Sequence, residues 1–359
     1  MFRTGYILNR RDDWVWFIAL PFAAVAIGLA SQRWLSAIAV VSFSLLLTAP
    51  HHFASWLRAY GVREDLKHWR APLTLGPVAI ALVTLVGITW APMSLLLLVW
   101  TWDHQHSIMQ QYGFARIYDY KAQSGAPSTA WFDLLLNWIL YANLMIVSPL
   151  YSDFWIRELY RFGLPISAVS IFTLQTVSST LVGLFLVAYV IHLAWTIRHG
   201  YAVNPTKYLF IGASYFLWYA TAWWTQSALV ATISHAIMHG VQYIVIVHSS
   251  LRRKGGTQKS VTSWLVQPHH IIAFLATCLF YSVLFQLITN QPLAAFGFGA
   301  IDFATQYASP IPELGKPGYT LSQAHELFAA LLITGAPLLH YFVDSFIWKV
   351  RDENVQAGL

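Results

Sequence analysis

Long apolar segments separated by short polar loops follow one another along the whole chain. A helix of about 20 residues, rising ~1.5 Å per residue, crosses a hydrocarbon core of ~30 Å. We therefore predict an all-α polytopic membrane protein, a bundle of about ten transmembrane helices that forms a single transmembrane helical domain over residues 1–359. The predicted spans cover residues of about 14–30, 34–57, 73–90, 92–117, 131–149, 168–197, 206–222, 228–249, 263–288 and 322–348.

The longest connection in this pattern, residues 290–320, is rich in glycine and proline. These residues favour turns over regular helix, so we predict an outer connecting loop there. The sequence shows no repeat of fixed period and no loop long enough for a separate soluble domain. Any chemistry is therefore expected within the helical bundle.

The basic residues orient this bundle. If the N-terminus is cytoplasmic, all but four of the 21 lysines and arginines lie on inner loops, in agreement with the positive-inside rule. The four on outer loops are Arg33, Arg157, Arg161 and Lys316. We therefore predict cytoplasmic N- and C-termini in a multi-pass protein of the cell inner (cytoplasmic) membrane.

The first span has a second explanation as a signal peptide, because Gly28-Leu29-Ala30 places small residues where such a peptide is cut. Asp12 and Asp13 directly before the span, together with its aromatic content, favour a retained anchor. Cleavage would leave the remaining topology unchanged.

Composition narrows the chemistry. With 57% hydrophobic and 10% charged residues, the chain is unlike a soluble domain. The net charge of +6 comes from loops beside the spans, where it sets topology, so we expect no nucleic-acid partner. The one cysteine, Cys278, excludes disulfide frameworks and thiolate metal sites. A bound metal must therefore be held by nitrogen and oxygen ligands.

Histidines supply the nitrogen ligands. Several lie inside the apolar spans, where an ionisable side chain is costly to bury and is therefore a functional candidate. They are His51, His52, His104, His106, His192, His235, His239 and His340. All fall on even-numbered spans, which cross the membrane in the same sense. The depth of each histidine in the membrane is estimated by counting ~1.5 Å per residue from the inner end of its span. Four histidines lie at a similar depth of ~9 to 16 Å, and they are His51, His106, His239 and His340. Such a common depth suits one metal site in a bundle core.

The spacing of His235 and His239 is the strongest local signal, because residues at i and i+4 share one helix face. A lone histidine such as His192 is explained equally well by a hydrogen bond to a neighbouring helix. Polar residues near the histidines are candidate partners that orient the rings or add ligands. They are Asp103 beside His104, Gln110 beyond His106, Gln242 beyond His235, and Asp344 one turn beyond His340.

Several segments together resemble the Brp/Blh family of membrane β-carotene 15,15′-dioxygenases. They are Pro50-His51, the mid-span His106, and Phe216-Leu217-Trp218-Tyr219-Ala220 followed by His235 and His239. The resemblance implies a four-histidine iron site formed by His51, His106, His235 and His239. The late Pro337, His340 and Asp344 are also similar to a cluster near the family's C-terminus.

The chain departs from the family pattern at His52, Ser55 and Gln111, and it carries the additional His104. Spacing alone does not separate His104 from His106 as a ligand, and the resemblance selects His106. The residues predicted as additional ligands or as supporting residues are His52, His104, His192, His340, Asp344, Asp103, Gln110 and Gln242.

Imidazoles without thiolates suit non-haem Fe(II), with copper and zinc as competitors. A centre inside the lipid slab calls for an apolar, membrane-resident substrate, with dioxygen as the second reactant. We therefore predict a membrane-embedded, histidine-ligated non-haem iron oxygenase, an iron-dependent oxidoreductase. Its substrate would be a lipid-soluble alkene or isoprenoid of carotenoid type, or an acyl chain.

Three alternatives use the same histidines. The surplus of imidazoles allows a diiron desaturase or hydroxylase acting on fatty acyl chains, although only His51-His52 and His269-His270 approach the clustered motifs of those enzymes. A haem b carrier would need two axial histidines from facing helices. A metal or proton transporter would need acidic residues and inverted repeats, which the sequence does not show.

Overall fold

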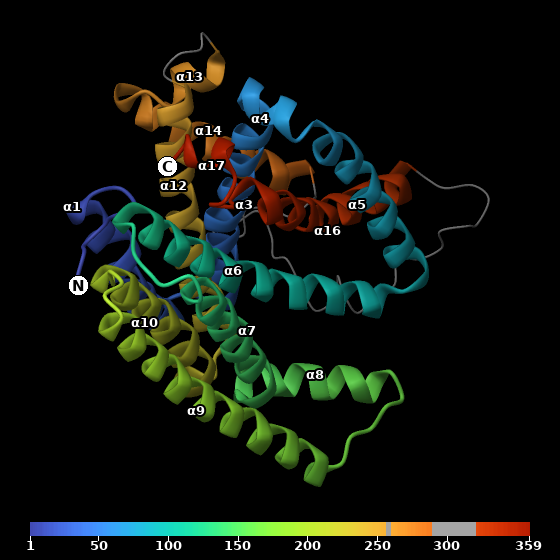
Figure 1. Ribbon diagram of the computed structural model, residues 1–359. Helices are drawn as coiled ribbons and strands as arrows, with labels where there is room; N and C mark the ends of the chain where they lie inside the picture. Colours follow the sequence, from blue (N-terminus) through green and yellow to red (C-terminus); the bar gives the residue numbers. More distant parts are fainter. Residues whose placement is uncertain (256–259, 289–320) are drawn as a thin grey trace. The chain divides into compact units, whose positions relative to one another are not determined.

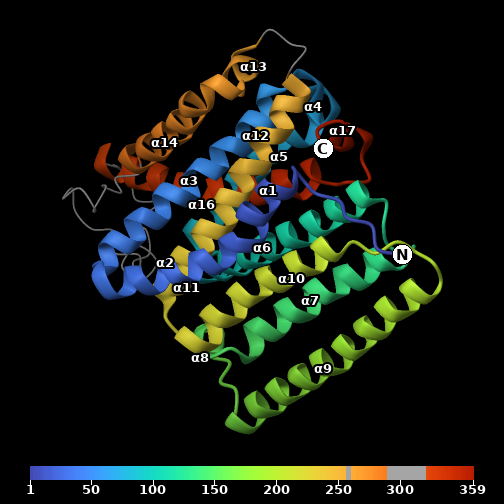
Figure 2. The ribbon, with the colours of Figure 1, turned by 90° about the vertical axis from the view of Figure 1, so that its left-hand side faces the viewer.

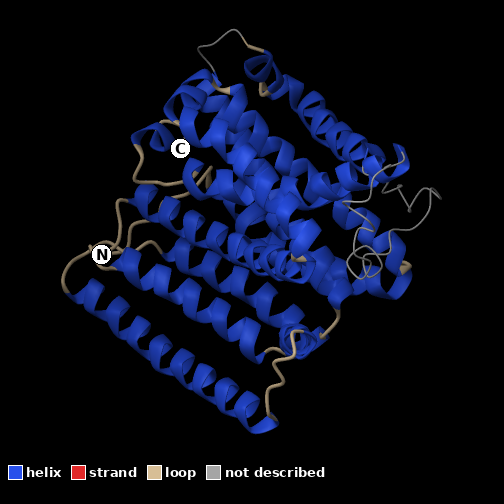
Figure 3. Ribbon diagram, turned by 90° about the vertical axis from the view of Figure 1, so that its right-hand side faces the viewer, coloured by secondary structure: helices blue, strands red, loops and turns tan. Residues whose placement is uncertain are grey.

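The computed structural model describes residues 1–255, 260–288 and 321–359. These residues form helices and short connections, and no strand lies among them (Figure 3). The prediction of an all-α fold is confirmed. The predicted outer loop at residues 290–320 lies outside the described residues.

Each of the ten predicted spans falls on a helix. Within the described residues, seven helices are long and apolar enough to cross a membrane, and their ranges are Arg10–Trp34, Arg70–Trp90, Thr129–Val147, Ala168–Arg198, Ala228–Lys254, Pro268–Gln286 and Leu327–Ile347. The other three predicted spans fall on α3 (Ala37–Gly61), α6 (Pro92–Ala122) and α10 (Pro205–Tyr219). The chain therefore has the helices of a membrane protein, and a count of ten spans with cytoplasmic termini remains a prediction.

The chain divides into two compact units. Unit 1 comprises Met1–Trp34 and Ser107–His239, and unit 2 comprises Leu35–His106 and Gly240–Leu359. Helix α6 contributes its first part to unit 2 and its second part to unit 1. A single domain over 1–359 remains a prediction.

Unit 1 begins with one continuous helix made of α1, η1 and α2. After α6 it continues with the helices α7 to α11 and with the π-helical turns η2 and η3. The bounds are α1 Arg10–Asp13, η1 Trp14–Ala19, α2 Leu20–Trp34, α7 Thr129–Val147, α8 Pro149–Arg161, α9 Ala168–Arg198, α10 Pro205–Tyr219, η2 Ala220–Thr225, α11 Ala228–His235 and η3 Ala236–Gly240. Figure 2 shows α7 and α9 side by side, and α2 packs against α10 and α11. A side chain at Gly28 would collide with Ser234, so this glycine permits the close approach of α2 and α11.

A buried ion cluster in unit 1 joins the second part of α6 to α7 and α10. Lys207 of α10 donates through Nζ to Oδ2 of Asp119 at 2.7 Å and to Oδ2 of Asp133 at 2.6 Å. Arg116 Nη1 donates to the same two carboxylate oxygens at 2.7 and 2.8 Å. Tyr189 of α9 donates to the other oxygen of Asp133 at 2.7 Å. Two cations and two carboxylates neutralise one another, as buried charges require.

Unit 2 is arranged around α3, which packs against α12, α14 and α16 (Figure 1). Helix α16 also packs against α5. The bounds in this unit are α3 Ala37–Gly61, α4 Arg63–His68, α5 Arg70–Trp90, α12 Val241–Gly255, α13 Val261–Leu265, η4 Pro268–His270, α14 Ile271–Ile288, α16 Leu321–Ile347 and α17 Glu353–Gln356. Prolines stand inside α3 at Pro50 and inside α16 at Pro337, where each lacks the amide that would close a helical hydrogen bond.

The backbone at Gly240, directly before α12, lies close to α3. A Cβ atom added at Gly240 would lie 2.8 Å from the backbone oxygen of Leu47 and 3.8 Å from Nδ1 of His51. A backbone carbonyl cannot swing away as a flexible side chain can. Glycine at this position therefore sets the spacing of the two helices beside His51.

Replacing Gly240 by alanine is expected to lower the thermal unfolding midpoint of the detergent-purified protein. Overpacking of this kind costs about 1–3 kcal/mol. The matched control is Gly183→Ala on α9, where an added Cβ meets no atom within 4 Å. That change should leave the midpoint unchanged or raise it slightly, because alanine favours helix over glycine by up to about 1 kcal/mol. Equal midpoints for the two variants would contradict the close approach.

Candidate metal centre

Helix α16 carries a histidine and a carboxylate one turn apart. His340 and Asp344 share a helix face because they stand at i and i+4. His340 is 0% and Asp344 9% exposed. Nε2 of His340 lies 3.8 Å from Oδ2 of Asp344.

Helix α3 places two more imidazoles against His340. Nε2 of His51 lies 3.0 Å from Nε2 of His340. The ring of His52 lies 4.7 Å from the ring of His340, measured between centroids. His51 is 1% and His52 5% exposed. The His340 ring therefore lies at the meeting point of α3 and α16.

The part of α6 that belongs to unit 2 adds His106, which is 7% exposed. Its Nε2 lies 3.7 Å from Oδ2 of Asp344. One ligand atom each from His106, His340 and Asp344 lie within 4.8 Å of one another. The His106 ring stacks on Tyr341 at 4.9 Å, and the Tyr341 hydroxyl donates to Asp103 at 2.8 Å. Asp103 therefore helps to orient His106 through Tyr341.

His106, His340 and Asp344 fit a metal ion in their spacing and donor chemistry, and His51 lies beside them against His340. Imidazole nitrogens bind a divalent transition metal at about 2.1 Å, so two such nitrogens at right angles are about 3.0 Å apart. The Nε2 atoms of His51 and His340 have that separation. The distances of 3.7 and 3.8 Å to the Asp344 oxygen need only small side-chain movements. Two histidines and one carboxylate form the donor set typical of non-haem Fe(II) sites with open coordination positions.

The predicted ligands His235 and His239 belong to unit 1. Their rings lie 5.4 Å apart and nearly parallel, and the ring of Trp218 lies 4.7 Å from that of His235. His239 stands in the π-helical turn η3, and such turns are frequent at functional sites. Gln110, predicted as a partner of His106, donates to the backbone oxygen of His239 at 3.4 Å. Metal binding by this pair remains a prediction.

Two other histidines that the sequence suggested as ligands, His104 and His192, make contacts outside the group of His106, His340 and Asp344. His104 and the backbone oxygen of Trp100, on the same helix, form a 2.7 Å hydrogen bond. His104 is in neither of the metal-ligand groups found among the described residues, whereas His106 is in one. His192 stacks on Phe132 at 4.0 Å and lies 3.1 Å from the hydroxyl of Thr129. This setting fits the structural explanation of His192. Gln242 is fully buried.

The sequence-based reasoning missed two hydroxyls beside the centre. Ser55 Oγ lies 2.7 Å from Nδ1 of His340, and the Tyr243 hydroxyl donates to Oδ1 of Asp344 at 2.7 Å. Ser55 stands one helical turn after His51, a spacing that was available as a signal. Tyr243 stands at the same spacing after His239.

Comparison with protein-family models, with curated proteins and with solved structures found no match. What the centre can do is therefore inferred from its own residues.

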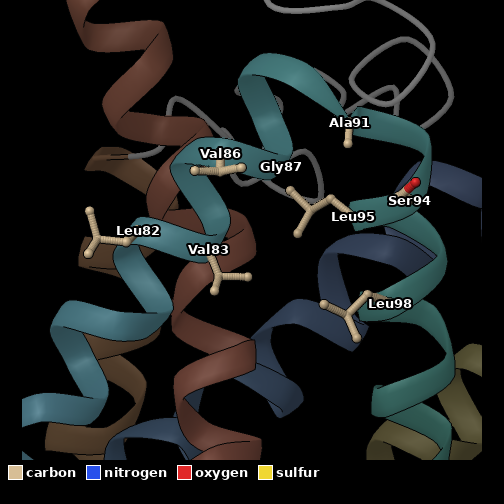
Figure 4. Close-up of a pocket in the computed structure, with 8 residues that line it drawn as sticks. All are labelled: Leu82, Val83, Val86, Gly87, Ala91, Ser94, Leu95 and Leu98. Atoms are coloured by element: carbon tan, nitrogen blue, oxygen red, sulfur yellow. The ribbon is translucent and has the colours of Figure 1, made fainter.

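An apolar groove lies in unit 2 between α5 and the first part of α6 (Figure 4). Its volume is about 370 Å³, and it is lined by Leu82, Val83, Val86, Gly87, Ala91, Ser94, Leu95 and Leu98. Leu95 precedes His106 by three helical turns, so the two side chains share one face of α6, about 16 Å apart along the axis. Between Leu95 and His106 this face packs against Leu338 and Tyr341 of α16.

Proposed function

We propose that the protein is a membrane-embedded, histidine-ligated non-haem iron oxygenase that acts on a lipid-soluble substrate. The observation that carries this proposal is the convergence of buried imidazole and carboxylate atoms on His340. Its Nε2 lies 3.0 Å from that of His51, and it shares a ligand group with His106 and Asp344. Buried ionisable groups inside apolar helices are costly unless they are paired or bind an ion.

The proposed ligands in unit 2 are His51, His106, His340 and Asp344. The set shares His51 and His106 with the set that the family resemblance implies, and it adds His340 and Asp344. The carboxylate matters for the choice of metal, because the group of His106, His340 and Asp344 has the two histidines and one carboxylate that favour Fe(II), whereas an all-imidazole set suits zinc or copper equally well. His235 and His239 are kept as predicted ligands to be tested separately.

The surroundings of these ligands favour an apolar reactant. Bound iron(II) would supply the redox chemistry by which dioxygen reacts with an alkene. The low exposure of His51, His106 and His340 keeps bulk water from the ligand atoms. Cleavage of an alkene by one dioxygen molecule places one oxygen atom on each carbonyl product, so it needs no external reductant.

The groove beside α6 supports the choice of an elongated apolar substrate. Seven of its eight lining residues have no polar side-chain atom, and the exception is Ser94. Ligand sites are typically apolar clefts with few polar groups. An isoprenoid or acyl chain fits this description better than a polar metabolite.

The test is metal analysis and oxygen uptake of the protein purified in detergent. We expect about one iron per chain, removed by a chelator and restored by Fe(II), and dioxygen consumption that requires a carotenoid or another long alkene. His106→Ala should lose the iron, and the matched variant His104→Ala on the same helix should keep it. Zinc in place of iron, or oxygen uptake that persists after chelation, would overturn the proposal. Two irons per chain would favour the diiron alternative, and a Soret band would favour haem.

A further inference from the structure

Two buried hydroxyls connect His340 to Asp344 by a second route. Ser55 Oγ of α3 lies 2.7 Å from Nδ1 of His340 and 2.5 Å from the hydroxyl of Tyr243 on α12. The Tyr243 hydroxyl lies 2.7 Å from Oδ1 of Asp344. Ser55 is 0% and Tyr243 1% exposed. Three helices thus contribute to one chain of hydrogen bonds that begins and ends on α16.

The direction of this chain follows from counting protons. When Asp344 binds a metal ion its carboxylate is ionised and only accepts, and each hydroxyl has a single proton to donate. If Ser55 donated to His340, Tyr243 would have to donate to Ser55, and Oδ1 of Asp344 would face two hydroxyl oxygens without a proton. Tyr243 therefore donates to Asp344. Ser55 then donates to Tyr243 across their 2.5 Å contact and accepts from Nδ1 of His340.

The accepting role of Ser55 fixes the state of the His340 ring. With its proton on Nδ1, a neutral imidazole carries its lone pair on Nε2. Nε2 is the atom that lies 3.0 Å from His51 and 3.8 Å from Asp344. A metal ligand must present an unprotonated nitrogen, and histidine ligands usually donate their other ring N–H to a fixed acceptor.

Neighbouring side chains hold Tyr243 in place. Nε1 of Trp348 donates to the Tyr243 hydroxyl at 3.2 Å. The guanidinium of Arg58 lies 3.9 Å from the centroid of the Trp348 ring, and Arg58 also donates to the Ile347 backbone oxygen at 2.9 Å. Arg58 is 0% exposed. The hydroxyl chain is therefore anchored by a buried cation–π contact.

We propose that Ser55 and Tyr243 are positioning residues that hold His340 in its metal-binding tautomer and couple it to Asp344. This inference rests on the proposed metal centre. It assigns a role in ligation to two residues that do not contact the ion, and it makes their effects inseparable, since either hydroxyl alone leaves the chain broken.

A double-mutant cycle on metal affinity tests the proposal. The variants are Ser55→Ala, Tyr243→Phe and the double variant, each stripped with a chelator and titrated with Fe(II) in competition with a chromogenic chelator. Each single variant is expected to bind about 10–100-fold more weakly, as loss of partners that orient ligands does. The double variant should bind no more than about threefold more weakly than the weaker single variant, because residues in one network are not additive.

Conservative and matched variants separate this role from ordinary core packing. Ser55→Thr keeps the hydroxyl and should restore most of the affinity. Ser44→Ala, also on α3, removes a buried hydroxyl that donates to the Val40 backbone oxygen. Tyr215→Phe removes a hydroxyl that donates to Asn137 in unit 1. Both controls should bind Fe(II) like the wild type.

The outcomes distinguish this inference from the proposed function. If the wild type binds iron and His340→Ala does not, but both hydroxyl variants bind like the wild type, the positioning role is wrong and the metal centre stands. Additive losses in the double variant would also overturn the coupling. If the wild type binds no iron, the proposed function itself fails. A Co(II)-loaded sample of Tyr243→Phe adds a spectroscopic readout, and an unchanged visible ligand-field spectrum would count against the positioning role.

Discussion

Replacing His340 by alanine is expected to reduce the iron content of the purified protein from about one ion per chain to near zero. His340 is the common member of the contacts in the centre, since its ring nitrogen lies 3.0 Å from His51 and 3.8 Å from Asp344. Without the Nε2 atom of His340, the remaining proposed ligands lose the nitrogen that lies between them. The same change deletes a side chain that is 0% exposed, which costs about 2–5 kcal/mol of stability in comparable core truncations.

Elemental analysis of the monodisperse protein measures this effect, and a second variant separates ligand loss from misfolding. His192→Ala removes a histidine that is 9% exposed and stacked on Phe132, so it has a comparable packing cost and should retain iron. Full iron content in His340→Ala, combined with loss of iron in His235→Ala and His239→Ala, would replace the ligand set proposed here with the one that the family resemblance implies.

Replacing Lys207 by methionine is expected to destabilise the protein by about 3–5 kcal/mol, the usual cost of removing one partner from a buried ion cluster. The methionine fills a similar volume but leaves Asp119 and Asp133 with Arg116 as their remaining cation. Both carboxylates are nearly inaccessible, at 3% and 1% exposure, so water cannot take the place of the ammonium group. Unfolding followed by tryptophan fluorescence in mixed detergent micelles measures the loss.

The control for this variant is Arg157→Met on α8. Arg157 pairs with Glu158 at 3.3 Å, but its side chain is 58% exposed, and such pairs contribute about 0–1 kcal/mol. The double variant Lys207→Met, Asp133→Asn should recover part of the lost stability, because it removes the one negative charge that Arg116 does not balance. A Lys207→Met protein as stable as Arg157→Met would contradict the account of the cluster.

The helices could be predicted from the sequence because each contains a long run of apolar residues, and such a run can be recognised without knowing the fold. It also singled out His51, His106, His340 and Asp344, because an ionisable residue inside an apolar segment is conspicuous by itself. The pairing of His51 with His340 was out of reach, since these residues are 289 positions apart and nothing local encodes their contact.

Other features escaped because their residue types carry no strong signal. Ser55 and Tyr243 resemble many other serines and tyrosines in apolar helices, and only the fold brings them to His340 and Asp344. Helix α8 is amphipathic rather than apolar, so the pattern of apolar segments did not predict it. Lys207 was interpreted by the positive-inside rule as an inner-loop charge, yet it is fully buried in an ion cluster.

The prolines inside α3 and α16 have a consequence for metal selectivity. Pro50 directly precedes His51, and Pro337 stands three residues before His340, so each helix bends most easily at the level of its ligand. Ligands carried on two bendable helices can follow the radius of the ion that they bind. A rigid cage that rejects ions by size is therefore not to be expected. We expect instead that the donor atoms, two imidazoles and a carboxylate, select Fe(II) by their chemistry.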